Sequence, residues 1–158
     1  MRLSIHAVGR MKAGPERELA DRYFDRLGKS GASVGLDFTG VVEIAESRAR
    51  DADERKRDEA AKLQAAPGSV LWLLDERGKN ISSEDFAGRL GALCDQGARG
   101  LTIAIGGPDG HDAALRQQAD FVLSFGALTW PHQIVRVLLA EQLYRATTIL
   151  SGHPYHRS

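Results

Sequence analysis

The chain has 158 residues, of which 42% are hydrophobic, and its 21 basic and 21 acidic side chains give a formal net charge of zero. This size is typical of one domain and this hydrophobic content excludes a disordered chain, while the absence of excess basic charge argues against loose binding to naked nucleic acid. The lone Cys94 excludes an internal disulfide and a cysteine-cluster metal site, and neither a signal peptide nor an apolar run of membrane-spanning length is found, which together predict a cytoplasmic protein.

The first half of the chain is predicted to form a strand, a helix, an extended segment and a charged helix. Residues 3–8 are apolar and end at a glycine, as strands often do. Pro15 marks a helix start, and the glycines of residues 28–31 end that helix. Residues 34–44 favour extended structure interrupted near Gly40. Residues 46–66 alternate in charge and predict an exposed helix whose apolar residues are mostly alanine.

The second half alternates between apolar strands and amphipathic helices. The strands are predicted at 69–74, 101–105 and 121–124, and the helices begin at Ser82, Asp112 and His132, the last running to about Ile149. This alternation predicts an α/β fold with a mostly parallel sheet, in one domain covering residues 1–158. Ligands of such sheets bind beyond the carboxyl ends of the strands, here at 74–75, 106–107 and 125–130.

Two of these strand ends are rich in glycine or poor in side-chain donors. The run Gly106 to Gly110 matches neither the dinucleotide fingerprint nor the P-loop, so its paired glycines indicate a tight turn or a close approach, more often by a neighbouring chain segment than by a ligand. The loop at residues 125–130 can bind through backbone groups, with Leu128 and Trp130 as apolar walls. Such a loop suits a flat heterocycle better than a phosphate.

The last helix and the tail carry the remaining candidates. Arg136 lies beside the apolar stripe of the helix and needs an acceptor if it is buried, and Glu141 and Arg145 form an i,i+4 pair. The stripe is wide, which predicts that part of it packs on a second copy of the chain. The tail carries two imidazoles, a phenol and a guanidinium, on His153, Tyr155, His156 and Arg157. The histidine spacing gives only a weak signal for metal, and no GxSxG motif supports a serine triad.

Four motifs in order, LLDERGK, IGGPDG, SFGALTWPHQIVRVLLAEQLYRA and the terminal HPYHR, resemble the RlmH family over the full length. These are SPOUT-class enzymes that use S-adenosyl-L-methionine to methylate a pseudouridine of 23S ribosomal RNA. The resemblance implies a C-terminal trefoil knot, a homodimer packed partly through the last helix, and a cofactor bound in the knot. The implied cofactor contacts are Leu74, Gly106, Gly107, Phe125, Gly126, Ala127, Leu128, Thr129 and Trp130.

The resemblance also implies a catalytic tail, serving either its own subunit or the partner. His153 or His156 would take the proton from N3 of the pseudouridine, Arg157 would stabilise charge on the neighbouring carbonyls, and Tyr155 would stack on or orient the base. Because the chain has no excess basic charge, we expect assembled ribosomal particles to be the substrate rather than bare RNA. The alternatives are a ribosome-binding protein without activity and a metal-dependent hydrolase that uses the histidines.

Overall fold

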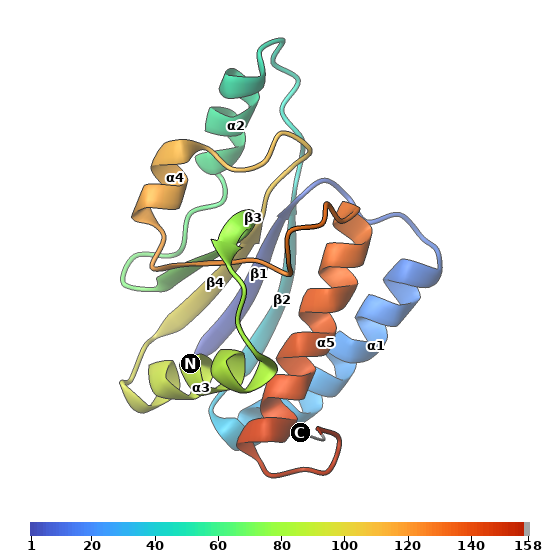
Figure 1. The fold of residues 1–158 in the computed structure, drawn as a ribbon, viewed down its shortest axis with the longest axis vertical. Helices are drawn as coiled ribbons and strands as arrows, with labels where there is room; N and C mark the ends of the chain where they lie inside the picture. Colours follow the sequence, from blue (N-terminus) through green and yellow to red (C-terminus); the bar gives the residue numbers. More distant parts are fainter. Residues whose placement is uncertain (157–158) are drawn as a thin grey trace.

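A single parallel sheet forms the centre of the molecule in the computed structural model, which describes residues 1–156 (Figure 1). Its five strands are ordered β2-β1-β4-β3-β5 and all pairs are parallel. The strands are β1 (Arg2–Val8), β2 (Asp37–Ile44), β3 (Val70–Lys79), β4 (Gly100–Ile105) and β5 (Phe121–Leu123). The predicted fold class, a mostly parallel sheet with flanking helices, is confirmed.

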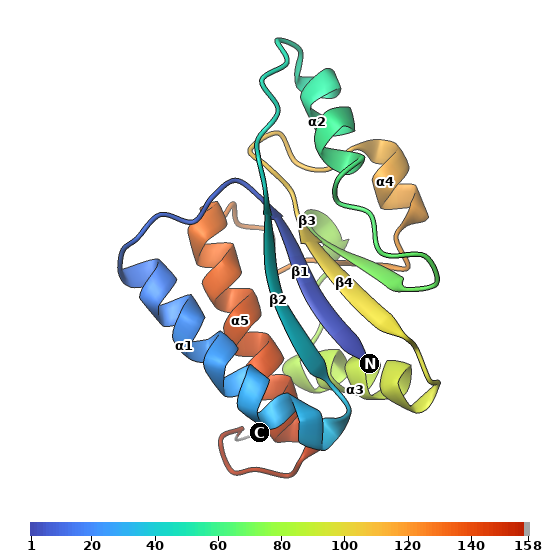
Figure 2. The same cartoon turned by 180° about the vertical axis from the view of Figure 1, so that it is seen from behind.

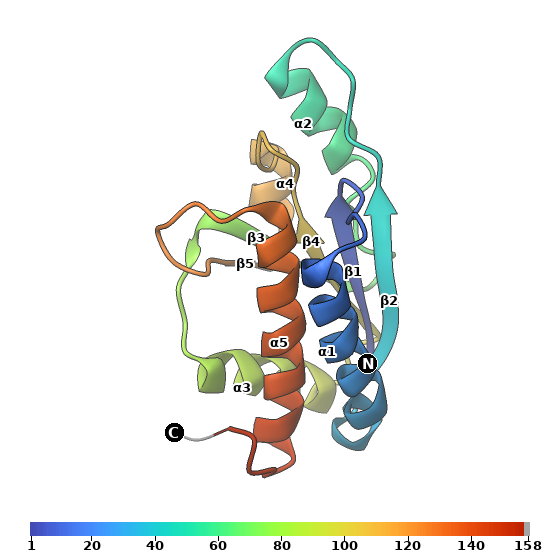
Figure 3. The same ribbon diagram turned by 90° about the vertical axis from the view of Figure 1, so that its right-hand side faces the viewer.

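Helices cover both faces of the sheet. They are α1 (Pro15–Ser30), α2 (Ala52–Ala60), α3 (Ser83–Asp95), α4 (Ala113–Gln118) and α5 (His132–Leu150), with a short 3-10 helix at Gly31–Val34. Helices α1, α3 and α5 pack together on one face, as the edge-on view shows (Figure 3). Helices α2 and α4 lie together beyond the other face (Figure 2). The N-terminus and the end of α5 lie toward the end of the sheet where the strands begin (Figure 2).

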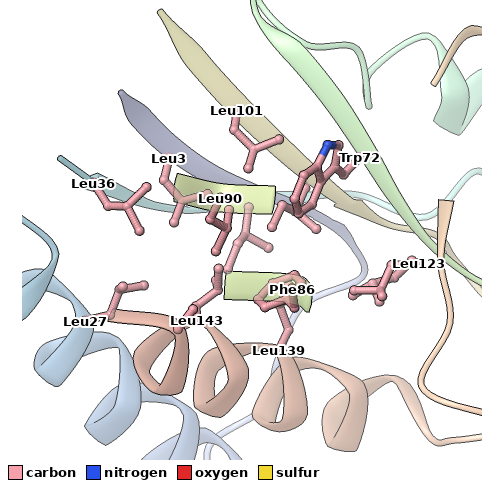
Figure 4. Packing of buried hydrophobic residues seen from close by; sticks show 14 of the residues in the cluster. Leu3, Leu27, Leu36, Trp72, Phe86, Leu90, Leu101, Leu123, Leu139 and Leu143 are labelled. Carbon is pink, nitrogen blue, oxygen red and sulfur yellow. The ribbon is translucent and has the colours of Figure 1, made fainter. Parts of the chain in front are cut away.

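The core is divided in two by the alternation of side chains along each strand. Along β3, Trp72 and Leu74 point toward α3 and α5, whereas Leu71 and Leu73 join the smaller core under α2 and α4. All four side chains are buried, as expected for a strand covered on both faces. The larger core includes Leu139 and Leu143 of α5 (Figure 4). Burial of this apolar surface is the main force that holds α5 against the sheet.

Helix boundaries follow the capping residues. Pro15 is the first residue of α1, and the Ser82 hydroxyl accepts a hydrogen bond from Asp85 N–H at the start of α3, both as predicted. The prediction of one helix over residues 46–66 is wrong, because α2 spans only Ala52–Ala60. Asp51 caps its N-terminus by accepting from the N–H groups of Asp53 and Glu54. Asp51 was the signal in the sequence for the start of α2, because aspartate is a favoured N-cap residue.

The extended segment predicted at residues 34–44 begins later than expected. Val34 ends the 3-10 helix, Gly35 is left-handed with φ 80°, and β2 starts at Asp37. The interruption expected near Gly40 is present as a register shift between β1 and β2, and Gly40 has φ 110°. Glycine suits this position because side-chain-bearing residues rarely adopt such a φ.

Strand β3 extends five residues beyond its predicted end at Leu74 and wraps around the end of β5. Both Leu74 and Lys79 of β3 pair with Leu123 of β5, so the residues between them curve past it. The backbone N–H of Ser124 then donates to the Lys79 carbonyl oxygen at 2.9 Å. The sequence did not predict this extension, because residues 75–77 are charged and strands are usually recognised by apolar residues. The trefoil knot that the resemblance implies stays a prediction.

The wrap depends on a close approach at Gly78. A Cβ atom there would lie 2.6 Å from the Leu123 carbonyl carbon and 2.7 Å from the Val122 carbonyl oxygen. We therefore expect Gly78→Ala to lower the free energy of unfolding by about 1–3 kcal/mol in urea titrations. Gly88→Ala is the matched control, because a Cβ at this exposed helical position meets nothing within 4 Å. The control should gain about 0.5–1 kcal/mol. Equal stability of the two variants would contradict the close approach.

Candidate functional site

The three predicted strand ends meet around one cavity of about 270 Å³. Its walls come from residues 74–77 after the straight part of β3, residues 105–111 after β4, and residues 123–126 and 128–130 after β5. The first turn of α5 closes it with His132 and Val135. All the residues predicted to bind the cofactor lie in this wall except Ala127. Three segments that are separate in the sequence therefore line one continuous cavity.

The glycine turn at 106–110 is compact because neighbouring chain segments crowd it. A Cβ on Gly107 would lie 2.8 Å from Oε2 of Glu59 and 3.0 Å from Val8 Cγ1. A Cβ on Gly106 would lie 3.2 Å from the imidazole of His111. The close approach is therefore made by the protein itself, as the sequence favoured. Gly106 and Gly107 also line the cavity.

His111 supports the floor of the site and was not singled out from the sequence. It is 3% exposed, and its Nε2 lies 2.9 Å from the carbonyl oxygen of Leu74. Because a carbonyl oxygen only accepts, Nε2 carries the proton in this contact. Burial lowers the pKa of His111 below its ordinary value, which keeps the imidazole neutral. No local pattern in the sequence marks His111, because its burial depends on contact with Leu74, which lies 37 residues away in the chain.

Ser124 shapes the loop on the other side of the cavity. Its hydroxyl lies 3.1 Å from the N–H of Gly126, from which it accepts, and 3.0 Å from the carbonyl oxygen of Gly126. Asn80 also donates to the Ser124 carbonyl oxygen at 3.3 Å. Beyond this anchored start the loop is exposed: Leu128 is 71% and Trp130 39% accessible. The two predicted apolar walls therefore face outward around the mouth.

The tail lies at the opposite end of α5 from the cavity (Figure 1). The 19 residues of α5 separate them by roughly 28 Å. Tyr155 OH donates to Oε1 of Glu141 at 3.2 Å, and Nε2 of His156 lies 2.7 Å from Oε1 of Glu84. His153 is exposed. Arg157, the fourth predicted catalytic residue, lies outside the described residues.

An aromatic and charged cluster holds Tyr155 in place. Its ring lies 4.9 Å from that of Tyr144, and the Arg145 guanidinium carbon lies 5.0 Å from its ring centroid. Arg145 also pairs with Glu141, which confirms the predicted i,i+4 pair. Burial, a hydrogen bond with Tyr23 and the charge of Glu141 raise the pKa of Tyr155, so its phenol stays protonated at neutral pH. Tyr155 therefore holds the tail against α5, and His156 holds it against α3.

Arg136 is buried, and it finds the acceptors that a buried arginine needs. Nη1 donates to Oε1 of Glu43 at 2.7 Å, and Nη2 donates to the carbonyl oxygens of Val8 and Gly9. The guanidinium therefore joins α5 to the ends of β1 and β2. These contacts inside the protein satisfy the guanidinium, so Arg136 does not face a substrate.

Residues 1–156 contain no group of three metal-ligating side chains from His, Cys, Asp and Glu within reach of one ion. Over the same residues, no helix combines the length and apolar character needed to span a membrane.

Comparison with known proteins defines the class. The family described as "Predicted SPOUT methyltransferase" matches residues 1–156. The chain therefore belongs to the SPOUT methyltransferase family.

Particular relatives share one name, ribosomal RNA large subunit methyltransferase H. The protein of Mesorhizobium japonicum is 68% identical and that of Brucella anthropi 63%, each over the full length of both chains. The Rhizobium johnstonii protein is 62% identical over 99% of both. Among solved structures, the SpoU methyltransferase AviRb from Streptomyces viridochromogenes, in complex with AdoMet, aligns with 14% identity and a TM-score of 0.38. The alignment covers 92% of this chain and 59% of the AviRb chain. Similarity this low adds nothing to the family assignment.

The buried imidazole at the site should make stability depend on pH. The unfolded chain carries a histidine of ordinary pKa, about 6.5, whereas the folded pKa of His111 is lower. Between these values the unfolded state binds more protons, so stability is complete above about pH 6.5 and falls as the pH falls. The loss from this residue is up to about 1.4 kcal/mol per pH unit.

The variant His111→Gln isolates this contribution, because glutamine can still donate to the Leu74 carbonyl oxygen but does not titrate. Urea unfolding at pH 7.5 and at pH 5.5 should show a smaller acid loss in the variant than in the wild type. The same loss in both proteins would mean that His111 is not held neutral.

Proposed function

We propose that this chain is a single-domain methyltransferase that uses S-adenosyl-L-methionine to methylate N3 of a pseudouridine in 23S ribosomal RNA, on assembled ribosomal particles. The observation that carries the proposal is the cavity formed by the three strand ends. The shared name of the full-length relatives supports the choice of ribosomal RNA. A ribosomal substrate places the protein in the cytoplasm.

The cavity suits the cofactor in chemistry, and its size is just below that of typical small-molecule sites. Its volume of about 270 Å³ is close to the lower end of the roughly 300–1,000 Å³ typical of small-molecule sites. The glycine turn and the loop at residues 124–126 line the cavity and would offer backbone N–H and C=O groups to a heterocycle, apart from the Gly107 carbonyl and the groups of Ser124 and Gly126 that are already bonded within the protein. Leu74, Phe125, Gly126, Leu128, Thr129 and Trp130 would complete the contacts, with Ala127 supporting the loop from outside the wall.

When bound, S-adenosyl-L-methionine supplies a methyl group activated by a positively charged sulfur. The chain must therefore position the acceptor nitrogen and remove its proton. His153 and His156 suit the second task, because imidazole is the side chain that most often serves as a general base in enzymes. Tyr155 stays a neutral phenol, which suits stacking or donation to the base. Arg157 is proposed to stabilise charge at the carbonyls of the base.

We infer that the protein acts as a homodimer in which the tail of one subunit completes the site of the other. Within one chain the tail and the cavity lie at opposite ends of α5, and they cannot meet while α5 is intact. Half-exposed apolar side chains on α5 offer a surface for a second copy: Ile134, Val135, Val137 and Leu138. Leu138 also lines a second groove with Phe86, Phe125 and Trp130, which extends this apolar surface toward the mouth.

The first test measures cofactor binding and methyl transfer. Calorimetry should show that S-adenosyl-L-methionine binds the protein, and labelled methyl groups should appear on one pseudouridine of 23S rRNA in purified ribosomes. Bare 23S rRNA should be a much poorer acceptor, because the neutral chain has little attraction for isolated RNA. Absence of binding would favour a ribosome-binding protein without activity. Equal rates on ribosomes and on bare RNA would contradict the proposal that the enzyme acts on assembled particles.

The second test asks which site the tail serves. Deletion of residues 153–158 should abolish methyl transfer while leaving cofactor affinity unchanged. The variant Gly107→Leu, in which the side chain collides with Val8 and Glu59, should lose cofactor binding while keeping its tail.

Mixing these two inactive proteins decides between the subunits. If the tail serves the partner, the mixed dimer contains one intact cavity with one intact tail, and activity should return. If the tail serves its own subunit, the mixture should stay inactive. Size-exclusion chromatography and circular dichroism must first show that both variants are folded dimers.

A further inference from the structure

Two loops that follow neighbouring strands form the rim beside the cavity. Residues 9–14 follow β1 and residues 45–50 follow β2, and both leave the sheet at the end where the cavity lies (Figure 1). The N–H of Gly9 donates to the Ile44 carbonyl oxygen at 2.8 Å, so the loops start side by side. Val8, just before the first loop, contacts the cavity residue Gly107.

The first loop is fixed by a buried arginine. Arg136 donates from Nη2 to the carbonyl oxygens of Val8 and Gly9, and Glu43 accepts from Arg136 and, at 2.7 Å, from the N–H of Met11. Arg17 donates to the Met11 carbonyl oxygen at 3.0 Å. Met11 itself is buried. The loop is thus anchored from both sides of Arg10.

The second loop is fixed in the same way by another arginine. Nη1 of Arg55 donates to the carbonyl oxygens of Ala49 and Arg50, at 3.0 and 2.9 Å. The same guanidinium makes two hydrogen bonds to the carboxylate of Asp109, at 2.7 and 3.0 Å. Asp109 lines the cavity. The loop is therefore tied directly to the glycine turn of the candidate cofactor site.

Both anchored loops expose cations. Arg10 and Lys12 project from the first loop and Arg48 and Arg50 from the second, and all four are exposed. Across residues 9–14 and 45–50, these four basic side chains face one acidic side chain, Glu46. Among ion pairs within residues 1–156, only Arg10 of the four has a partner, Glu43 at 3.9 Å. The positive charge of the rim is available to a ligand.

We propose that these four cations bind phosphates of the RNA that surrounds the target nucleotide. This inference rests on the proposed function and adds the surface that holds the substrate. The cations are spread over two loops outside the cavity, which fits an extended polyanion better than a small anion. Because the loop backbones are already fixed, less conformational entropy is lost on binding. Phosphate contacts of this kind orient a nucleic acid without reading its sequence.

The test compares pairs of charge-neutralising variants. Arg10→Gln with Lys12→Gln, and Arg48→Gln with Arg50→Gln, should each raise KM for ribosomal particles about ten-fold and leave kcat and cofactor affinity unchanged. The dependence of log KM on log salt should become shallower by about 1–2 for each pair. The control pair is Arg2→Gln with Arg99→Gln, which removes the same charge from the opposite end of the sheet. The control should behave as the wild type.

The outcomes separate this inference from the proposed function. If the wild type methylates particles and the rim variants match the control pair in KM and in salt dependence, the rim does not bind the RNA, although the enzyme assignment stands. If rim and control pairs weaken binding equally, only the net charge matters and the rim is again excluded. If the wild type itself neither binds the cofactor nor methylates particles, the proposed function fails and the rim proposal fails with it.

Discussion

The contact between β3 and Leu123 is the constraint on which the cavity depends. Both Leu74 and Lys79 of β3 pair with Leu123. The chain before and after Leu123 is therefore fixed relative to β3. The loop that follows β5 must then run beside the ends of β3 and β4. A side chain at Gly78 would push these backbones apart. The close approach of the Gly78 and Leu123 backbones thus brings segments from different strands together in one wall of the cavity.

Helix α5 has the opposite effect, because it separates groups that a reaction would need together. Its first turn closes the cavity, and its last turn leads into the tail. An α-helix is stiff, and Leu139 and Leu143 fix this one to the sheet, so its length sets the distance between cavity and tail. A single chain therefore carries both halves of the proposed site but cannot join them. In the proposed homodimer, packed through the half-exposed side of α5, the tail of one chain would meet the cavity of the other.

Much of this arrangement could be predicted from the sequence because the signals are local. The apolar run at β3, the serine cap at Ser82 and the proline at the start of α1 depend on neighbouring residues only. The extension of β3 through polar residues could not be predicted in this way, because its pairing partner Leu123 is distant in the chain. The same holds for His111, whose burial depends on Leu74 and on the turn above it. The segments predicted to bind the cofactor line one cavity and their contacts with it stay a prediction, whereas the distance between cavity and tail required the structure.

The zero net charge of the chain conceals an uneven distribution of its charges. Arg136, Arg55 and Arg116 are each paired with a carboxylate, and these pairs hold the end of the sheet where the cavity lies. Their charges are therefore largely neutralised within the protein and contribute little to the field outside it. The exposed cations of the rim keep theirs, with a single acidic neighbour in the same loops. A chain without net charge can thus present a small positive surface at one place. Under the proposed function, this surface would bind RNA that is held at the cavity, whereas the rest of the protein would attract nucleic acid little.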